Sequence, residues 1–413
     1  MRILIVTQYF WPESFRINDL ALGLEERGYK VTVLTGKPNY PSGSFFPGYS
    51  FFKRNKEEYE GIKILRVPLV SRGNGGKLRL MLNYVSFVLS AMLLAPFRCR
   101  DSYDIIFVYE PSPITVGLPA LLLKAIKGTP IMFWVQDLWP ESLSATNAIR
   151  SQRVIKIIEQ LVRFIYRGCD RILIQSKAFF ESIVKLGAER DRILYFPNSA
   201  EELYRPVVVE EDAPELMKMP QGFRVMFAGN IGTAQDFPTI IAAAELLKEY
   251  KDIHWIILGN GRMYSWVNEM VKARKLTDTV HLLGWHPVES MPRYFSIADA
   301  MLVTLKREVI FSLTIPSKLQ SYLACSKPVI AALEGEGARV ITEAGAGLTV
   351  PPEDPKALSQ AVLDMYRMSY EELMTMGASG RQYYEKHFER AMLLDRLVEC
   401  MQALRKEPYP CEP

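Results

Sequence analysis

Short, continuous runs of apolar residues recur along the whole chain, and this feature constrains the fold more than any other. Runs without polar alternation are typical of strands covered on both faces, as in parallel sheets. Helical patterns lie between the runs, for example over residues 17–27, so the first half predicts a doubly wound α/β domain. The runs of the first half are ILIV (3–6), VTVLT (31–35), IKILRV (62–67), DIIFVY (104–109), PIMFWV (130–135) and RILIQ (171–175).

The second half repeats this rhythm, and 413 residues are too many for one core. The segment 201–220, rich in proline and acidic residues, breaks the pattern and predicts a linker. We therefore predict two Rossmann-like parallel-sheet domains, 1–200 and 221–387, that face each other across a cleft. A C-terminal helix, 388–413, is expected to return towards the first domain. The apolar runs of this half are FRVMFAGN, IHWIILGNG, VHLLG, DAMLVTL, KPVIAAL and AGLTV.

Charge differs between the two halves. Residues 1–200 hold 27 Lys and Arg against 17 Asp and Glu, a net of +10, whereas residues 201–413 hold 23 against 29, a net of −6. A basic half predicts an anionic partner, such as a membrane surface or a phosphate, although a solvated basic surface without a partner stays open. Nucleic acid is disfavoured, because the basic residues are not interleaved with aromatics in a recognisable module.

Residues 80–97, LMLNYVSFVLSAMLLAPF, form the longest apolar run. As a helix it would be about 27 Å long, just short of the roughly 30 Å hydrocarbon core of a bilayer. The α/β pattern continues on both sides, so we expect a buried or surface-associated helix, with peripheral attachment to the inner face of the cytoplasmic membrane. The basic residues around this run and the amphipathic segment 149–169 are Arg72, Lys77, Arg79, Arg98, Arg100, Arg150, Arg153, Lys156, Arg163 and Arg167.

The spacing of the cysteine, histidine and aspartate residues does not predict a metal site or a redox site. The five cysteines lack a CxxC pair, as expected for a reducing cytosol, and the short N-terminal apolar run carries no secretory cleavage site. The four histidines show no ligand spacing and no Asp-x-Asp occurs, so we predict neither a metal nor another cofactor. Glu334-Gly335-Glu336 could bind a metal, but a solvated loop is the simpler interpretation.

Three strand-to-loop junctions in the second half end in glycine: FAGNIG, ILGNGR and LEGEGA. Glycines there let the backbone approach a ligand, and the helix N-termini that follow offer N–H donors to phosphate. The helix start at Pro316, Ser317 and Lys318 adds a hydroxyl and a cation, unless it is only an ordinary capped helix. GNGRMY lacks the third glycine of an NAD fingerprint, so the set predicts a diphosphate pocket with Arg262 and Lys318 as cations.

The first half offers two candidate loops at strand ends. In DLWPES, Asp137 and Glu141 form a carboxylate pair that could orient an acceptor hydroxyl or draw off its proton, although Asp137 could instead cap a helix. In QYFWPESFR, aromatic side chains are expected to face sugar or isoprenoid, and Arg16 a phosphate. In the second half, Trp285 follows a strand and could stack on a nucleobase or pack at the edge of the core.

The ordered set of motifs resembles a known family. Five segments of the second half are similar to the nucleotide-sugar domain of the family-four retaining glycosyltransferases, which have the GT-B fold. In chain order they are strand-GN, strand-GxG, LLGWHPVESMPRYFSIADAMLVTL, PSKLQSYLACSKPVIA and EGEGARVITEAGAGLTVPPEDP. ILIVTQYFWPESFRINDLALGLEERGYKVTVLTG and WVQDLWPES resemble the bacterial subgroup that builds O-antigen and capsule repeats, which includes the N-acetyl-L-fucosamine transferases. The resemblance covers nearly the whole chain.

The chain departs from the family pattern at several positions. The two family glutamates fall on Leu313 and Ser321, and the catalytic-domain histidine falls on Gln136. The Arg and Lys after the first donor-domain strand fall on Asn230 and Gln235. The resemblance then implies that Ser317, Lys318 and Ser321 take phosphate and ribose contacts, and that Glu334 or Glu336 supplies the missing carboxylate.

The resemblance implies transfer of a sugar, with retention, from a UDP-sugar to a polyprenyl-diphosphate-linked saccharide. A catalytically inactive module that binds nucleotide sugar or lipid is one alternative, and a UDP-sugar epimerase is another. The expected donor residues are Gly229, Asn230, Gly232, Gln235, Gly259, Gly261, Arg262, Trp285, Pro316, Ser317, Lys318, Ser321, Glu334, Gly335, Glu336 and Gly337. The expected acceptor residues are Tyr9, Phe10, Trp11, Glu13, Arg16, Asp137 and Trp139, and the expected catalytic residues are Asp137, Glu141, Arg262 and Lys318.

Overall fold

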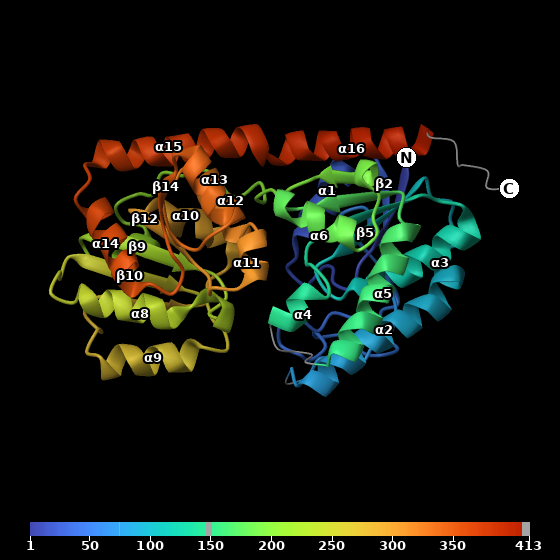
Figure 1. Ribbon diagram of the computed structural model, residues 1–413, viewed down its shortest axis with the longest axis horizontal. Helices are drawn as coiled ribbons and strands as arrows, with labels where there is room; N and C mark the ends of the chain where they lie inside the picture. The colour runs from blue at the N-terminus through green and yellow to red at the C-terminus, as the bar shows by residue number, and fades with distance from the viewer. Residues whose placement is uncertain (74, 146–150, 407–413) are drawn as a thin grey trace. The chain divides into compact units, whose positions relative to one another are not determined.

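The computed structural model describes residues 1–73, 75–145 and 151–406, which form two compact units (Figure 1). The first unit comprises Met1–Pro197 together with the chain from Ala391 onward, and the second comprises Asn198–Arg390. The acidic, proline-rich segment 201–220 belongs to the second unit, where Met219 is buried in the core and Tyr204 and Leu216 pack against it. Arg150 lies outside the described residues, as does the side chain of Lys77.

The first unit is built on a sheet of eight strands in the order β3-β4-β2-β1-β5-β6-β7-β8. Its paired strands are parallel except β3, which runs antiparallel to β4. The strands are β1 (Arg2–Val6), β2 (Lys30–Thr35), β3 (Lys56–Tyr59), β4 (Ile62–Arg66), β5 (Ile105–Glu110), β6 (Ile131–Val135), β7 (Arg171–Ile174) and β8 (Ile193–Tyr195). The helices are α1 (Arg16–Glu26), α2 (Lys77–Arg98), α3 (Gly117–Lys127), α4 (Glu141–Ala145), α5 (Gln152–Gly168), α6 (Phe180–Lys185) and α16 (Arg390–Lys406).

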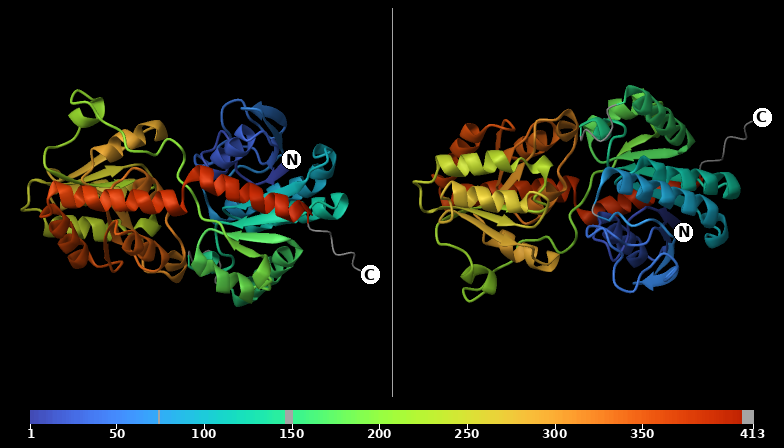
Figure 2. Two further views of the ribbon diagram at one scale, coloured as in Figure 1. Left: turned by 90° about the horizontal axis from the view of Figure 1, so that it is seen from above. Right: turned by 90° about the horizontal axis from the view of Figure 1, so that it is seen from below.

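The continuous apolar runs are strands covered on both faces, as the sequence predicts. Ile3, Leu4, Ile5 and Val6 of β1 alternate between the two faces, yet all are fully buried. Helices α1 and α16 pack on one face, where Leu397 and other apolar residues of α16 join the strand side chains in a single core. Helices α2, α3 and α5 lie together on the opposite side of the sheet, as Figure 2 also shows.

The apolar pattern does not predict two edge strands. Strand β3 has the sequence KEEY and exposes alternate side chains, because an edge strand is paired along one side only. Strand β8 has three residues and is too short for a pattern. The expectation of a wholly parallel sheet is therefore corrected at β3, which forms an antiparallel hairpin with β4 across residues 60 and 61.

The second unit has a six-stranded parallel sheet in the order β11-β10-β9-β12-β13-β14. Its strands are β9 (Phe223–Ala228), β10 (Ile253–Leu258), β11 (Val280–Gly284), β12 (Ala300–Thr304), β13 (Val329–Ala332) and β14 (Gly347–Val350). The helices are α7 (Pro214–Met217), α8 (Phe237–Leu246), α9 (Tyr264–Ala273), α10 (Met291–Ser296), α11 (Val309–Leu313), α12 (Ser317–Ala324), α13 (Glu336–Ala344), α14 (Pro355–Tyr366) and α15 (Tyr370–His387).

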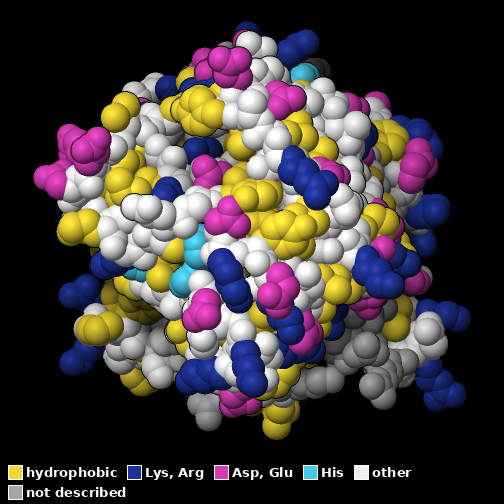
Figure 3. Space-filling model, turned by 90° about the vertical axis from the view of Figure 1, so that its left-hand side faces the viewer, with side chains coloured by type: hydrophobic (Ala, Val, Ile, Leu, Met, Phe, Trp, Pro, Cys, Tyr) yellow, Lys and Arg dark blue, Asp and Glu magenta, His cyan; other side chains and the backbone are white. Residues whose placement is uncertain are grey.

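Two cores sandwich this second sheet. Helices α8, α9 and α14 contribute to the core on one face, and α10, α12 and α13 contribute to the core on the other. The surface of the second unit that Figure 3 shows mixes hydrophobic, basic and acidic side chains without a broad patch of one kind. The unit is therefore a doubly wound α/β domain, and both sheets together confirm the predicted fold class.

Candidate functional site

The carboxyl ends of β9, β10, β12 and β13 gather the glycine-rich loops of the second unit. The strand order reverses direction at β9. The chain first adds β10 and β11 on one side of β9, and later adds β12, β13 and β14 on the other side. Ligands of open α/β sheets bind outside the carboxyl ends of the strands at such a switch point. The loop after β9 begins at Gly229 and the loop after β10 begins at Gly259.

Gly229 and Gly259 bring these two loops into direct backbone contact. Their φ angles are 139° and 135°, in a region that side chains rarely allow. A Cβ atom added to Gly259 would lie 1.9 Å from the carbonyl oxygen of Gly229. The Gly229 N–H donates to the Leu258 carbonyl at 3.0 Å, so the two strands remain paired up to this point.

Gly261 continues the close packing of these loops. A Cβ atom there would lie 2.5 Å from the carbonyl oxygen of Ile231. That same carbonyl accepts the N–H of Met263 at 2.9 Å, and the Ile231 N–H donates to Asn260 at 2.9 Å. Arg262, between these bonded residues, is exposed, so its guanidinium is available at the surface of the loop.

Lys318 carries the most unusual charge of the second unit. Its ammonium nitrogen is buried, has no hydrogen-bond partner among the described residues, and lies 3.7 Å from the centroid of the Phe227 ring. A Cβ atom added to Gly229 would be 3.2 Å from the same nitrogen, so the cation lies beneath the first glycine loop. Burial lowers the pKa of Lys318 to about 7.

Helix α12 presents Lys318 from its first turn. Pro316 is the residue before the helix and provides no side-chain cap, and Ser317 is exposed. Ser321 is only 5% exposed on the inner side of the helix, so the structure gives it little surface for the expected ribose contact. The helix start therefore offers a hydroxyl and a cation, as predicted, but not the second serine.

The loop between β13 and α13 contains the two candidate glutamates. Glu334 is exposed, whereas Glu336 accepts two hydrogen bonds from the guanidinium of Arg339, at 2.9 and 3.0 Å. Glu336 is therefore paired with a cation of its own helix, and its role as the missing family carboxylate stays a prediction. A Cβ atom at Gly335 would lie 1.9 Å from the Ser312 carbonyl, and one at Gly337 would lie 3.1 Å from the Pro316 ring, so this loop packs closely on the start of α12.

Asn230, Gln235 and Trp285 complete the donor candidates. The side chains of Asn230 and Gln235 converge on Gly232, where an added Cβ atom would lie 2.7 and 2.9 Å from their amide groups. The Oε1 atom of Gln235 is buried and unpaired within the described part of the chain. Trp285 is 71% exposed, so its ring is not part of the core edge.

The first unit places the aromatic residues after β1 in different environments. Phe10 is fully buried in the core, which corrects the expectation that it faces an acceptor. Tyr9 is also buried and stacks on Phe15, with ring centroids 4.9 Å apart. Trp11 stacks on Tyr59 of β3 at 4.5 Å and retains some exposed surface.

Glu13 is the acidic residue of this loop, and its pKa is shifted. One of its carboxyl oxygens accepts the N–H groups of Asn39 and Tyr40 at 2.8 and 2.7 Å, and the other oxygen is buried without a partner among the residues described. Burial raises the pKa of Glu13 to about 7, against the two backbone bonds that favour the carboxylate. Arg16 is the first residue of α1 and is partly exposed.

Three further carboxyl groups follow the neighbouring strands β5 and β6. Glu110 ends β5, Asp137 lies two residues beyond β6, and Glu141 begins α4. Burial raises the pKa of Asp137 to about 7, although a hydrogen bond from Ser142 favours the ionised form. Burial also raises the pKa of Glu141. Trp139, between them in sequence, is 7% exposed and therefore offers an acceptor little surface.

Glu110 escapes detection in the sequence because it ends the apolar strand IIFVYE and reads as part of it. It is fully buried, and both carboxyl oxygens lack a hydrogen-bond partner in the described parts of the chain. Burial and the neighbouring Asp137 carboxylate raise the pKa of Glu110 well above its ordinary value. An acidic residue at the end of a buried strand is the signal that could have found it.

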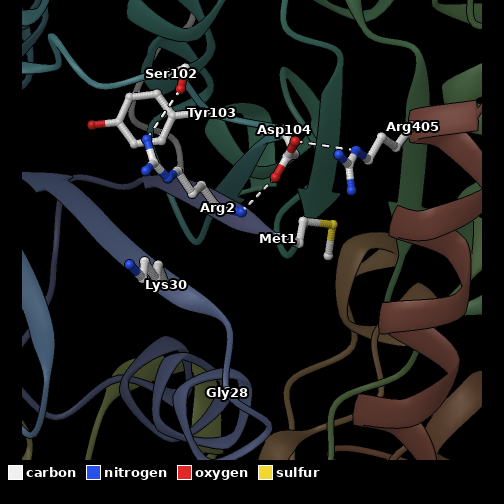
Figure 4. Close-up of a pocket in the computed structure, with 8 residues that line it drawn as sticks. All are labelled: Met1, Arg2, Gly28, Lys30, Ser102, Tyr103, Asp104 and Arg405. Carbon is white, nitrogen blue, oxygen red and sulfur yellow. Dashed lines mark hydrogen bonds and ion pairs between the residues drawn. The ribbon is translucent and has the colours of Figure 1, made fainter.

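A separate hollow of about 380 Å³ lies at the amino ends of β1, β2 and β5, so it belongs to the other edge of the first sheet (Figure 4). Its lining includes Arg2, Lys30 and Arg405, but Asp104 accepts the Arg2 backbone N–H at 2.7 Å and pairs with Arg405 at 3.2 Å. Within the described residues, no group of three or more His, Cys, Asp or Glu side chains could hold a metal ion.

Two family descriptions match most of the chain. Residues 14–199 match the family described as Glycosyl transferase 4-like domain, and residues 222–368 match the family described as Glycosyl transferases group 1. The two matches follow the division into structural units closely.

Curated relatives agree with these families. The chain is 28% identical over 334 residues to the probable glycosyltransferase WbjE of Pseudomonas aeruginosa, covering 78% of this chain and 80% of that protein. It is 22% identical to the putative colanic acid biosynthesis glycosyl transferase WcaI of Escherichia coli strain K12, covering 96% of this chain and 99% of the relative.

Solved structures identify the architecture. Sucrose-phosphate synthase of Thermosynechococcus elongatus superposes with a TM-score of 0.76 at 16% identity, covering 98% of both chains. Anabaena Alr3699/HepE, in complex with UDP and glucose, superposes with a TM-score of 0.69 at 17% identity over 98% of this chain and all of the other. The two Rossmann-like units thus define a GT-B fold, and the chain belongs to the group 1 glycosyltransferases.

The backbone contact between the first two glycine loops generates a stability prediction. Gly259→Ala is expected to reduce the free energy of unfolding by about 3 kcal/mol, because the methyl group overlaps the Gly229 carbonyl at a φ angle reserved for glycine. Gly345→Ala is the matched control: it also has a positive φ but only an ordinary contact at 4.0 Å, so a loss of about 1 kcal/mol is expected. Urea denaturation measures both, and equal losses would contradict the close contact.

Proposed function

We propose that this protein is a retaining glycosyltransferase that transfers a sugar from a UDP-sugar to a polyprenyl-diphosphate-linked saccharide during the assembly of a bacterial surface polysaccharide. The similarity to WcaI, named for colanic acid biosynthesis, supports the pathway, and the UDP found with HepE supports the nucleotide. The resemblance of the N-terminal motifs to N-acetyl-L-fucosamine transferases favours an amino or deoxy sugar as the donor group.

The buried, unpaired ammonium of Lys318 carries this proposal. A buried cation without a counter-ion is costly, so a fold retains one where an anion binds. The nitrogen lies beneath Gly229 and next to the close backbone contact with Gly259, where peptide N–H groups and the start of α12 also favour negative charge. A nucleoside diphosphate supplies the missing anion.

The same charge explains the chemical step. When the bond between the sugar and the diphosphate breaks, negative charge develops on the leaving UDP and the sugar becomes oxocarbenium-like. Lys318, exposed Arg262 and the helix start stabilise that charge without a divalent ion. The acceptor hydroxyl attacks from the face of the leaving group, so the anomeric configuration is retained.

The acceptor is assigned to the first unit. Glu13 and Asp137, both with a pKa raised to about 7, lie after β1 and β6 and could orient or deprotonate a hydroxyl group near neutral pH. We assign acceptor contact to these two carboxyls and to the exposed part of Trp11, since Phe10 is in the core.

A membrane-facing role for α2 accompanies this proposal. Among the described residues, Leu78–Arg98 is the one helix long and apolar enough to cross a membrane, and 28% of its most apolar stretch is buried in the first unit. Its exposed apolar side chains recur along one side, and basic Arg79 and Arg100 lie near its two ends. We propose that this side lies on the surface of an anionic bilayer, where a lipid-linked acceptor is found. The exposed apolar side chains of α2 are Leu78, Met81, Leu82, Val85, Leu89, Leu93 and Phe97.

Replacement of the buried cation tests the donor site. Lys318→Met is expected to weaken UDP binding by about tenfold to a hundredfold, because a charge-assisted bond to phosphate is lost. The melting temperature of the free protein should not fall, because the substitution removes an unpaired buried charge. Lys356→Met, at an exposed position of α14, is the control and should bind UDP normally. Calorimetric titration with UDP measures the effect, and unchanged affinity refutes the assignment.

The lowered pKa of Lys318 predicts a pH dependence. Bound diphosphate favours the ammonium form, so UDP binding takes up a proton once the free side chain is neutral. UDP affinity is therefore expected to fall by up to about tenfold between about pH 7.5 and about pH 8.5, well above the phosphate pKa of about 6. In Lys318→Met the affinity should be flat over this range, and a fall of the same size there would show another cause.

Metal removal gives a third test. If protein cations stabilise the leaving diphosphate, transfer measured with and without EDTA should differ by less than about twofold. A tenfold loss of rate that added Mg²⁺ restores would contradict this mechanism.

Charged substitutions on α2 test the membrane surface. The double variant Leu89→Glu/Leu93→Glu should weaken binding to phosphatidylglycerol-containing vesicles at least about tenfold, because two inserted apolar side chains become charged. Leu246→Glu on α8, an equally exposed leucine of the second unit, is the control. Sedimentation with vesicles at low salt measures binding, and equal binding of all variants would remove α2 from the contact.

A further inference from the structure

A row of polar side chains follows four neighbouring strands of the first sheet. Strands β1, β5, β6 and β7 are adjacent and parallel, so their carboxyl ends share one edge. Glu110 is the last residue of β5, Gln136 and Gln175 directly follow β6 and β7, and Gln8 lies two residues beyond β1. We call these four residues the polar row.

Every member of the polar row has a buried polar atom that no described residue satisfies. These atoms are Oε1 of Gln8, both carboxyl oxygens of Glu110, Nε2 of Gln136 and Oε1 of Gln175. Gln8 and Gln175 are 2% exposed and Glu110 is fully buried. Unpaired buried polar groups are destabilising and rare, so four at consecutive strand ends require a common explanation.

Hydrogen bonds to other atoms of the same residues hold the row in place. The Nε2 atom of Gln8 donates to Asn83 of α2 at 2.8 Å. The Gln136 backbone N–H donates to the Glu110 carbonyl at 3.1 Å, and Nε2 of Gln175 donates to the Gln136 carbonyl at 3.5 Å. The side-chain amides of Gln8 and Gln175 are therefore fixed, and the backbones of Glu110 and Gln136 are fixed beside them, as expected of a preorganised binding site.

The chemistry of the row distinguishes it from the donor site. Its members offer acceptors and an amide donor but no cation, so they do not match a phosphate. Burial and the Asp137 carboxylate raise the pKa of Glu110 well above its ordinary value, which favours the protonated carboxyl, a group that can both donate and accept. The hydroxyl of Tyr166, which also lacks a described partner, interacts electrostatically with Glu110. Uncharged hydroxyl groups match this mixture.

We propose that the polar row of Gln8, Glu110, Gln136 and Gln175 binds the hydroxyl groups of a sugar ring. The inference rests on the proposed function and extends it, because it assigns sugar recognition to strand ends of the first unit that none of the comparisons identifies. The ring is that of the acceptor saccharide or of the donor, and the two sources are separated by experiment.

The first experiment uses probes that separate sugar binding from nucleotide binding. N-acetylglucosamine, glucose and L-fucose are tested with the full chain by saturation-transfer NMR, and UDP by calorimetry. Gln136→Met and Gln175→Met remove an amide at nearly constant size and are expected to weaken sugar binding about threefold to tenfold, the loss of one or two hydrogen bonds, with UDP binding unchanged. Lys318→Met should instead weaken UDP binding and leave sugar binding unchanged.

Controls make each outcome decisive. Gln402→Met, an amide replacement at an exposed position of α16, should change the binding of neither the sugars nor UDP. If the wild-type protein binds none of the three sugars, or the row variants bind them as well as wild type, the inference fails. If instead UDP alone fails to bind, the donor proposal fails while the sugar result still stands. Melting temperatures of the variants identify any general loss of structure, and an equal loss of UDP binding in the row variants would assign the row to stability.

Two further measurements identify the source of the ring. If the row holds the donor sugar, Gln175→Met weakens UDP-N-acetylglucosamine but not UDP. If the row holds the acceptor, Gln175→Met binds both UDP and UDP-N-acetylglucosamine normally. The apparent KM of this variant for the acceptor in a bacterial lipid extract then rises about threefold to tenfold. No change in either quantity overturns the role in transfer.

Discussion

The backbone contact between Gly229 and Gly259 is the constraint on which the donor site depends. The ends of β9 and β10 meet at these two glycines with no side chain between them. The loop after β9 therefore packs closely on the loop after β10, and the Lys318 ammonium lies next to Gly229. The aromatic ring of Phe227 supports the cation from the other side, since a ring face attracts a positive charge. A larger residue at either glycine would separate the loop from the cation that it covers.

Each unit leaves unpaired polar groups at the carboxyl ends of its strands or beside them. In the second unit these groups include a cation, Lys318, which suits an anionic ligand. In the first unit the polar row consists of amides and the carboxyl of Glu110, which suit uncharged hydroxyl groups. The proposed reaction between a nucleoside diphosphate sugar and a saccharide needs both kinds of recognition, and the two proposals assign one to each sheet.

Much of the fold was predictable from the sequence because strands buried on both faces leave continuous apolar runs. The run VTVLT corresponds to β2 (Lys30–Thr35), and the predicted helix over residues 17–27 corresponds to α1 (Arg16–Glu26). Charged or very short edge strands such as β3 carry no such pattern and were missed. The glycine loops and Lys318 were predictable because few residue types meet those backbone and charge requirements.

The polar contacts of the site were less predictable, since they depend on partners distant in the chain. The sequence offers Glu336 as a candidate for the missing family carboxylate, and only the structure shows that Arg339, in the next turn of the same helix, is its counter-ion. Phe10 follows Tyr9 in the same loop, yet it turns into the core. Glu110 ends an apolar run, and its polar environment is assembled from residues distant in sequence, Asp137 after β6 and Tyr166 of α5.

Helix α16 has a consequence for the biogenesis of the protein. Its residues Leu393, Leu397 and Met401 complete the core of the first unit, although the whole second unit precedes them in the chain. During translation, the first unit therefore exposes an unfinished hydrophobic face until α16 leaves the ribosome, whereas the second unit has all of its strands earlier. Residues 1–197 expressed alone would retain that uncovered face, so a separable N-terminal fragment must carry α16 with it.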